Sequence, residues 1–435
     1  MRLQILMVSA AALALAACSG GTGSSDPFVG FGPNPSLDAP KKQSIPVINI
    51  AKVAGWPKGG APTAPPGFVV TKFAEGLEHP RWLLVLPNGD VLVAESSSEA
   101  GKPKDFRGWA AQFIMGSAGA AGKSPNKIIL LRDADGDGVA ETRSVFAHDL
   151  KRPFGMTLVG DKLYVADDDA VVSLPYLPGQ TESSATPQKV LDLPGGPINH
   201  HWTKNVLASP DGTKLYVTVG SNSNVGENGM AAEAGRAEVM EYTLPNGPAR
   251  PYATGIRNPN GLDFEPTSGV LWTAVNERDE IGDDLVPDYM TGLKDGAFYG
   301  WPYSYYGAHV DARVTPARPD MVAKAIAPDY ALGPHTASLG LAFYKAALFP
   351  QKYQGGVFIG QHGSWNRKPL NGYRVVFVPF ADGKPTGKPE VFLSGFLNAD
   401  NKVQGRPVGV VVDAKGALLV ADDVGNAVWR VAPAK

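Results

Sequence analysis

The chain has 435 residues, and 43% of them are hydrophobic, which is enough to bury a sizeable core. Its formal net charge is -2 at pH 7 and it has no basic tract, so we expect no nucleic-acid partner. Glycine (51 residues) and proline (38 residues) are both frequent, as in chains with many turns between short strands.

Residues 1–17 have the pattern of a secretory signal peptide. Arg2 gives the positive start, and the apolar run after it is too short to span a bilayer. Ala16 and Ala17 precede Cys18 in a tetrapeptide that resembles a bacterial lipobox, where the cysteine is lipid-modified. Cys18 is the only cysteine, and a stray thiol is the alternative. We expect a periplasm-facing protein that touches the membrane only through a lipid on Cys18.

The rest of the chain divides into a tether and one globular domain. Residues 18–65 are rich in Gly, Ser and Pro with little periodicity, which predicts a flexible tether. The globular domain covers residues 66–435. Inside it we expect a short helix within residues 100–124 and a long loop over residues 283–300.

One pattern recurs six times in the globular domain. A polar residue opens an apolar run, which leads through a turn into a second apolar run, as in a β-hairpin. Repeated hairpins, with room for about two more strands after each, predict an all-β fold, a six-bladed β-propeller. Separate β-sandwiches are the alternative, but no linker appears after residue 66. The copies open at His79, Arg152, His201, Arg257, His335 and Arg406.

The opening residues of the six copies are all cationic or imidazole side chains. In a propeller the inner strands line a channel, so their entry loops gather at one mouth. Converging cations in a concave site favour an anionic ligand. The alternative is that the arginines pair with carboxylates of their own blades, such as Asp167 or Asp422.

An acidic turn provides a second candidate metal site. Asp133, Asp135 and Asp137 alternate as in a calcium-binding loop. The twelfth position of that loop is Ser144 where a bidentate Glu is usual. The segment therefore reads as a polar hairpin turn, with calcium binding as the alternative.

Five stretches together resemble one enzyme family. The chain is similar to the glucose/sorbosone dehydrogenases that use pyrroloquinoline quinone (PQQ), and most similar to the L-sorbosone dehydrogenase branch. The resemblance covers roughly residues 66–433 and implies a six-bladed propeller carrying PQQ and calcium. The matching stretches are residues 200–212, 255–262, 276–302, 361–367 and 405–409.

The resemblance implies a catalytic pair. His201 takes the place of the general base that removes the hydroxyl proton, a role that suits imidazole near neutral pH. Arg257 takes the place of the cation that stabilises the reduced quinone oxygen, as an oxyanion hole does. His200, Phe154 and Val408 replace polar residues of the glucose-oxidising relatives.

The resemblance also implies the cofactor contacts. Asn258, His335, Arg367 and Arg406 fall at positions that contact PQQ, and arginine forks suit its carboxylates. Calcium is expected at Asp279 and Glu280, mainly through backbone oxygens. A surface-loop role for these two acids is the alternative.

The expected function is therefore PQQ- and calcium-dependent oxidation of a sugar or sugar aldehyde, with electrons passing to a respiratory acceptor. Two alternatives remain from different classes. One is a calcium-dependent lactonase on a similar propeller, and the other is a non-catalytic lipoprotein whose propeller binds a partner.

Overall fold

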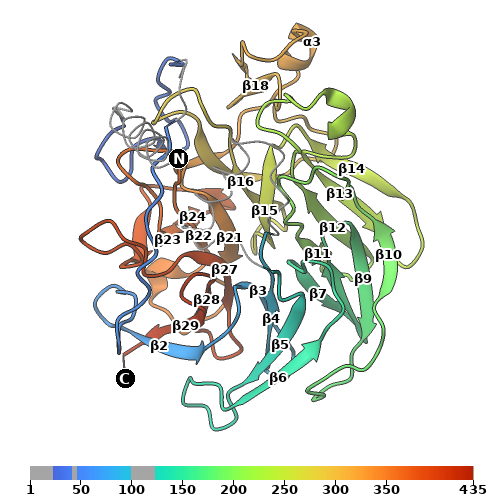
Figure 1. Cartoon of the computed structure of the whole chain (residues 1–435), viewed down its shortest axis with the longest axis vertical. Coiled ribbons are helices and arrows are strands. Elements are labelled where there is room, and N and C mark those ends of the chain that lie inside the picture. The colour runs from blue at the N-terminus through green and yellow to red at the C-terminus, as the bar shows by residue number, and fades with distance from the viewer. Residues whose placement is uncertain (1–22, 42–46, 99–122, 435) are drawn as a thin grey trace, which may run out of the picture.

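The protein is a six-bladed β-propeller, as the repeated hairpins predict (Figure 1). A computed structural model describes residues 23–41, 47–98 and 123–434. Six antiparallel sheets surround one centre, and each has four strands or, in one case, five. The signal peptide, Cys18 and nearly all of the segment expected to hold a helix lie outside the described residues.

Each blade is built from strands that are close in sequence, apart from the last. Blade 1 contains β3 (Pro80–Val85), β4 (Val91–Glu95), β5 (Lys127–Arg132) and β6 (Thr142–Ala147). Blade 2 contains β7 (Met156–Val159), β8 (Lys162–Ala166), β9 (Ala170–Pro175) and β10 (Gln188–Asp192). Blade 3 contains β11 (Val206–Ala208), β12 (Lys214–Val219), β13 (Glu238–Thr243) and β14 (Ala249–Thr254).

The other three blades complete the ring. Blade 4 contains β15 (Asn258–Phe264), β16 (Leu271–Asn276), β17 (Pro287–Gly292) and β20 (Tyr330–Pro334), with β1 (Phe31–Gly32) paired outside β20. Blade 5 contains β21 (Ser338–Phe343), β22 (Val357–Gln361), β23 (Arg374–Val378) and β26 (Glu390–Leu393). Blade 6 contains β27 (Pro407–Val412), β28 (Leu418–Asp422), β29 (Ala427–Pro433) and β2 (Phe68–Glu75). Short elements are β18 (Ser304–Tyr305), β19 (His309–Val310), β24 (Phe380–Ala381), β25 (Lys384–Pro385), α3 (Pro319–Val322) and the 3₁₀ turns Met230–Glu233 and Gln351–Tyr353.

The hydrophobic core is divided among the blade interfaces. Side chains alternate along a strand, so in β4 Leu92 and Ala94 pack towards blade 2, whereas Val91 and Val93 pack towards blade 6. Equivalent apolar clusters fill the other four interfaces. Because both faces of a blade are buried, its inner strands read as continuous apolar runs.

The six predicted hairpins are the two inner strands of the six blades. The first strand of each hairpin contacts the first strands of the two neighbouring blades, and together they form a closed ring round the channel (Figure 1). Gly340 shows how close this packing is, because a Cβ there would lie 2.3 Å from the carbonyl oxygen of Val408. A side chain at Gly340 would therefore push blades 5 and 6 apart.

Blade 6 joins the two ends of the described chain. Strand β2 pairs with β29 from Phe68↔Pro433 to Glu75↔Ala427. The carboxylate of Asp422 reinforces the blade by accepting hydrogen bonds from the indoles of Trp56 (2.7 Å) and Trp429 (3.0 Å). The ring is thus closed by backbone pairing and by a buried indole–carboxylate contact.

The prediction of a long loop over residues 283–300 is wrong. Its middle forms β17, the third strand of blade 4, and every residue of that strand is buried. The strand lies between an acidic turn and a Gly-rich segment, which hid its short apolar core of Tyr289 and Met290 in the sequence. Tertiary pairing with β16 and β20 decides its conformation.

The described parts of residues 18–65 also contradict the prediction of a flexible tether. Strand β1 extends blade 4, and two buried arginines of blade 5 hold the backbone nearby. Arg367 donates to the carbonyl of Ser24 (2.8 Å) and Arg374 to that of Pro27 (2.6 Å). The composition is that of a linker, but these long-range donors fix the segment on the propeller.

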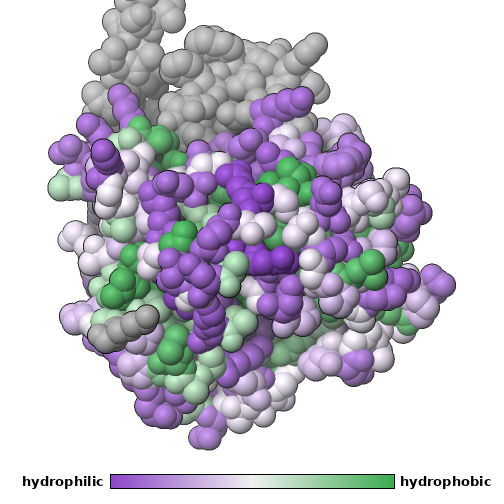
Figure 2. All heavy atoms as spheres, turned by 90° about the horizontal axis from the view of Figure 1, so that it is seen from below, coloured by the Kyte–Doolittle hydropathy of each residue, from purple (hydrophilic) through white to green (hydrophobic). Residues whose placement is uncertain are grey.

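Among the described residues, no helix combines the length and apolar character needed to cross a bilayer. Figure 2 shows one face that is mostly hydrophilic, with apolar side chains scattered over it. Isolated apolar side chains of this kind are ordinary on a folded protein.

Candidate functional site

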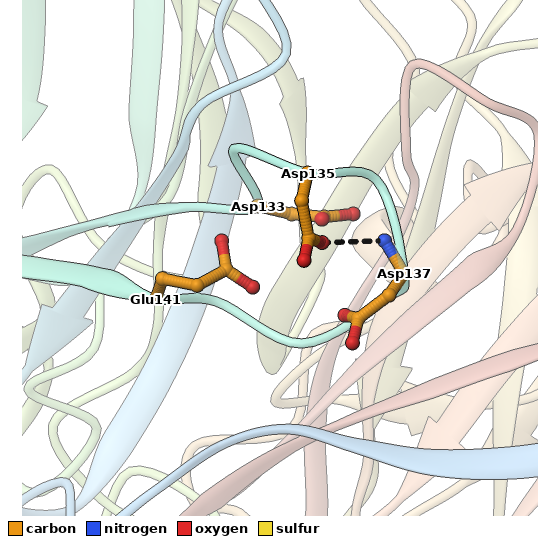
Figure 3. Close-up of side chains that lie close together, drawn as sticks. All are labelled: Asp133, Asp135, Asp137 and Glu141. Carbon is orange, nitrogen blue, oxygen red and sulfur yellow. Dashed lines mark hydrogen bonds between the residues drawn. The ribbon is translucent and has the colours of Figure 1, made fainter.

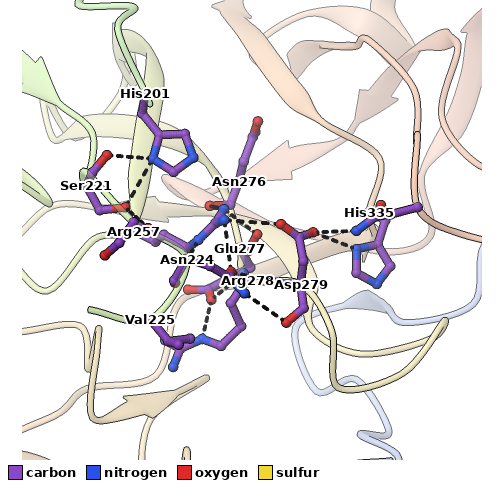
Figure 4. Close-up of polar contacts among 12 residues, drawn as sticks. His201, Ser221, Asn224, Val225, Arg257, Asn276, Glu277, Arg278, Asp279 and His335 are labelled. Atoms are coloured by element: carbon purple, nitrogen blue, oxygen red, sulfur yellow. Dashed lines mark hydrogen bonds and ion pairs between the residues drawn. The ribbon is translucent and has the colours of Figure 1, made fainter. Parts of the chain in front are cut away.

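A polar cavity of about 370 Å³ lies at the entry ends of the inner strands of blades 3, 4 and 5. The loops before β11, β15 and β21 and those after β12, β16 and β22 supply its walls. Figure 4 shows how side chains from these loops point towards one another. The lining residues are His200, His201, Ser223, Asn224, Glu227, Arg257, Asn258, Asn276, Glu277, Asp279, Glu280, Asp288, His335, Ala337, Trp365 and Asn366.

His201 presents a bare ring nitrogen. Its Nδ1 lies 2.7 Å from the carbonyl oxygen of Ser221, and a carbonyl only accepts, so Nδ1 carries the proton (Figure 4). Its Nε2 has no partner within the described protein and is the free acceptor of the ring. Burial and then the charge of Arg257 lower the pKa of His201 to about 3. The imidazole is therefore neutral at ordinary pH, as a general base must be.

Arg257 is buried in the cavity wall and fixed on three sides. Its guanidinium donates to the carbonyl of Glu277 (2.6 Å), to both side-chain and backbone oxygens of Asn224 (3.0 and 3.2 Å), and to Asp279 (3.2 Å). Such a network holds the cation in one orientation beside His201 (Figure 4).

Asp279 lies between two cations. Its carboxylate accepts from Arg257 and from His335 Nδ1 (3.2 Å), while His335 Nε2 donates to the carbonyl of Gly282 (2.9 Å). Burial raises the pKa of Asp279, but the hydrogen bond from His335 and the charge of Arg257 outweigh it and hold the pKa below its usual range. Burial lowers the pKa of His335, but Asp279 outweighs it and raises that pKa. His335 is therefore an imidazolium in the cavity wall.

Asn258 leaves a polar atom without a protein partner. Its Oδ1 is buried and accepts no hydrogen bond within the described residues. Gly220 leaves room for this oxygen, because a Cβ there would lie 2.4 Å from it and 2.5 Å from the Cβ of His201. An unpaired buried acceptor in a cavity is a place where a ligand donor or a metal ion gains most.

Oxygen donors for a metal are plentiful on the same wall. Glu280 is exposed at the mouth with a φ of 73°, and Asp279 and Asp288 line the same cavity. The carbonyl of Asp279 already accepts from Arg313 (2.8 Å) and Asn224 (3.2 Å). This set of carboxylate, amide and carbonyl oxygens suits a hard cation such as calcium.

The structure places several predicted residues outside the cavity. Arg367 is fully buried, and its donors go to Ser24, Asp283, Asp284 and Pro369. Arg406 points to the carbonyl of His362 (3.2 Å) and lies over the ring of Tyr373. Of the six opening residues, His201, Arg257 and His335 meet in the cavity, whereas Arg152 pairs with Asp168 of its own blade.

Two of the three departures from the relatives have structural roles, and the third lies at the cavity mouth. Phe154 and Val408 are completely buried in the core between blades 1 and 2. His200 is exposed at the cavity mouth, and only its backbone contacts Asn222 (3.4 Å). The carbonyl of Ser221 therefore orients His201, and position 200 has no part in that contact.

The acidic turn between β5 and β6 gathers four carboxylates. Possible ligand oxygens of Asp133, Asp135, Asp137 and Glu141 lie within 4.8 Å of one another (Figure 3). Lys415 caps Asp133 at 3.0 Å, and the aspartates accept backbone N–H groups of the turn. These contacts fit the polar-turn interpretation, and Glu141 is a member that the spacing of the aspartates did not indicate.

Sequence reasoning missed the residue that links the site together. Asn224 contacts Arg257 and also accepts from the backbone N–H of Asp279 (3.0 Å) and the indole of Trp301 (2.9 Å). The signal was present, since the polar run Ser221-Asn222-Ser223-Asn224 follows a buried strand with only Gly220 between them. A polar run at a strand end that faces the channel is where site residues are expected.

Comparison with known proteins identifies the family. A family model described as TrAA12-like matches residues 127–287 and 315–434, more than half of the chain, and the chain belongs to this family. An uncharacterized protein of Borreliella burgdorferi is 28% identical over 67% of this chain and 79% of its own length. A pyrroloquinoline quinone-dependent pyranose dehydrogenase of Coprinopsis cinerea is 23% identical over 84% of this chain. The match spans about half of that relative, 54% of its length.

Solved structures confirm the fold. The calcium structure of the family AA12 enzyme of Trichoderma reesei has a TM-score of 0.69 and 18% identity, covering 89% of this chain and 99% of that one. The holo form of the PQQ domain of the Coprinopsis cinerea enzyme has a TM-score of 0.67 and 21% identity, covering 88% and 100%. The predicted relationship with PQQ-dependent sugar dehydrogenases is therefore confirmed at the level of fold and family.

Proposed function

We propose that the protein oxidises a sugar with PQQ as cofactor and calcium as the cofactor's metal. The observation that carries the proposal is His201, whose proton lies on Nδ1 and whose bare Nε2 lies in the cavity beside Arg257 and Asn258. A neutral imidazole next to a fixed guanidinium can take a hydroxyl proton where negative charge is developing on a neighbouring oxygen.

The residues of the cavity fit the cofactor and its metal. Asn258 offers an unpaired oxygen, Arg257 a fixed cation, and Asp279 and Glu280 the oxygens that calcium prefers. Arg257 and Asn258 would hold the ring system, and the loop at residues 279–280 the calcium. When bound, PQQ supplies an acceptor for the hydride that leaves the sugar carbon.

His201 performs the proton step in this mechanism. Its Nε2 accepts the proton of the sugar hydroxyl, and the charge gained on the ring is stabilised through Nδ1 by the carbonyl of Ser221. Arg257 is kept in place by Asn224 and Asp279, so it costs little reorganisation during the reaction. Sugar aldehydes react by the same route as their hydrates, and sorbosone is the aldehyde that we propose to test.

The test is reconstitution. The purified chain would be incubated with PQQ and calcium, and dye reduction measured over a panel of aldoses and sorbosone. We expect turnover that requires both additions and disappears on chelation. Absence of turnover together with absence of quinone binding would contradict the proposal.

A lactonase is the second candidate, and one observation favours it. The cavity contains five carboxylates and four asparagines, a donor set that also suits a metal which activates water. In that case calcium alone would support hydrolysis of sugar lactones, with no need for PQQ. The same preparation, assayed with calcium and lactones, separates the two functions.

Electron transfer to a respiratory acceptor and anchoring through Cys18 belong to the same proposal. A periplasm-facing, lipid-anchored dehydrogenase would deliver its electrons at a membrane surface. The sequence around Cys18 supports this location. Mass spectrometry of the mature N-terminus, compared with a Cys18→Ala variant, checks it.

A further inference from the structure

One aromatic side chain stands out at the cavity mouth. Trp365 has 42% of its surface exposed and is the only exposed aromatic among the large hydrophobic side chains of the described chain. It lines the cavity, where the other side chains are polar except for Ala337. An indole with a free face inside a polar cavity offers an apolar surface that the protein itself does not cover.

The loop that carries Trp365 is held on both sides. The backbone N–H of Asn49 donates to the carbonyl of Trp365 (2.8 Å), and the Asn49 amide donates to that of Arg367 (2.8 Å). The next residue, Asn366, donates to Asp279 (2.7 Å) in the cavity wall. The indole is therefore presented on a fixed backbone, which lowers the entropy cost of binding a ligand.

One carboxylate that makes no ion pair within the described residues lines the same cavity as Trp365. Glu227 is exposed, and its two oxygens accept the backbone N–H groups of Asn224 (2.8 Å) and Val225 (2.7 Å). The deeper carboxylate of Asp279, by contrast, is neutralised by Arg257 and His335. A carboxylate oxygen that accepts one N–H keeps a lone pair for a hydroxyl or ammonium donor, and its charge repels another anion.

We propose that Trp365 is the platform on which the sugar ring stacks, with Glu227 accepting a hydroxyl group of the ring. The C–H face of a sugar ring is apolar while its rim is rich in donors, which matches an indole face and a carboxylate in one cavity. The site therefore selects neutral sugars and amino sugars over sugar acids. This inference rests on the proposed function, since it names the substrate class of the same cavity.

The first experiment uses the protein loaded with PQQ and calcium. For glucose, Trp365→Ala is expected to raise KM about tenfold with kcat little changed, because the variant loses the apolar surface on which the ring stacks. Trp365→Phe is expected to recover most of the loss, and Leu177→Ala, at a remote exposed position, to change nothing. An unchanged KM in Trp365→Ala would overturn the platform.

The role of the negative charge in the cavity is tested with glucose, glucosamine and glucuronate, which share one ring and differ in charge. Glucosamine is expected to bind at least as well as glucose, and glucuronate about tenfold more weakly because of repulsion. Glu227→Gln is expected to narrow the difference in KM between glucuronate and glucose. Equal KM values for glucuronate and glucose in the wild type would overturn the proposed selection against acids.

A binding measurement separates this inference from the proposed function. If the loaded protein oxidises no sugar, the proposed function fails, but stacking is still measured by saturation-transfer NMR of glucose with the unloaded protein. Transfer to the ring protons in the wild type that is lost in Trp365→Ala supports the platform. Absence of transfer in the wild type, or equal transfer in the variant, overturns it.

Discussion

His201 combines a fixed tautomer with a bare nitrogen, and its neighbours explain both. The carbonyl of Ser221 selects the tautomer, and the charge of Arg257 adds to burial in keeping the ring neutral. In the proposed reaction the ring receives a proton only when a hydroxyl is deprotonated beside it. The same contacts make the residue testable by substitution and by pH.

His201→Ala is expected to lower kcat about 10²- to 10⁴-fold, the usual contribution of a positioned general base. Dye-linked turnover of the loaded protein measures the effect. His148→Ala is the matched control, since His148 is exposed and its one ion pair among the described residues is with its neighbour Asp149. A loss of less than about threefold in His201→Ala would assign the base to another residue.

Activity is expected to persist well below the ordinary histidine pKa. Because the pKa of His201 is lowered to about 3, the ring stays neutral between pH 7 and about 5, and kcat/KM should show no acid limb near 6.5. Only the unfolded chain takes up the proton between 6.5 and 3, so stability falls as pH falls through that window. An acid limb centred near pH 6.5 in the kcat/KM profile of both the wild type and the His148→Ala control would contradict the lowered pKa of His201.

The sequence predicts the position of site residues better than the direction of their side chains. His201, Arg257, Asn258, Asp279 and His335, all named from the sequence, line one cavity. Arg367 and Arg406 do not reach the cavity, because nearby carbonyls capture their guanidinium groups. Which acceptors stand near an arginine depends on loops from other blades, and spacing along the chain does not contain that information.

At the scale of elements, the N-terminal segment and the loop after β16 support the site from outside. Arg367 joins them, since it donates to Ser24, to the carbonyl of Asp283 and to the carboxylate of Asp284 (2.5 Å). Asn49 extends this support to the backbone beside the cavity. The segment that composition marks as a tether thus holds in place the loops that form the cavity wall.

Arg367→Ala is expected to lower the free energy of unfolding by about 3–5 kcal/mol, because it leaves a largely buried carboxylate and several carbonyls unpaired. Denaturant unfolding followed by fluorescence measures the change. Arg318→Ala is the control, since its pair with Asp320 is solvent-exposed and such pairs contribute about 0–1 kcal/mol. Equal losses in the two variants would show that the Arg367 network does not hold the segment.

The six inner hairpins were predictable and the outer elements less so. Inner strands are buried on both faces, and their turns contain the Gly, Asn and Asp residues that hairpins need. Strand β17 and the packed N-terminal segment depend on partners far away in sequence, such as β20 and Arg374. Local pattern is informative only where local interactions decide the conformation.

At the scale of the whole molecule, stability comes from six similar apolar interfaces between blades and from the pairing of β2 with β29, which closes the ring. Each interface is an apolar cluster between two blades, so no single core dominates. The closure differs because β2 and β29 come from opposite ends of the sequence. Trp429 lies at that point, buried between the indole of Trp56 and the carboxylate of Asp422.

Trp429→Ala is expected to destabilise the protein by about 3–5 kcal/mol, since it opens a cavity and removes a donor from buried Asp422. Differential scanning calorimetry measures the fall in Tm. Trp365→Ala serves as the matched control, because its indole is exposed and surface substitutions change stability by about 0.5 kcal/mol or less. Similar Tm values for both variants would contradict a closure that depends on Trp429.

The pairing of β2 with β29 also sets the order of assembly. Blades 1 to 5 take their four main strands from successive stretches of chain, so each can pair as its own residues become available. Blade 6 cannot be completed until the last strand meets one of the first, and such a distant contact closes a very large loop. Until β29 pairs with β2, the strand β2 and the two open edges of the ring can pair with strands of other molecules. Refolding should therefore show a slow final phase that reports on Trp429, and the intermediate before it should be the form most prone to aggregate.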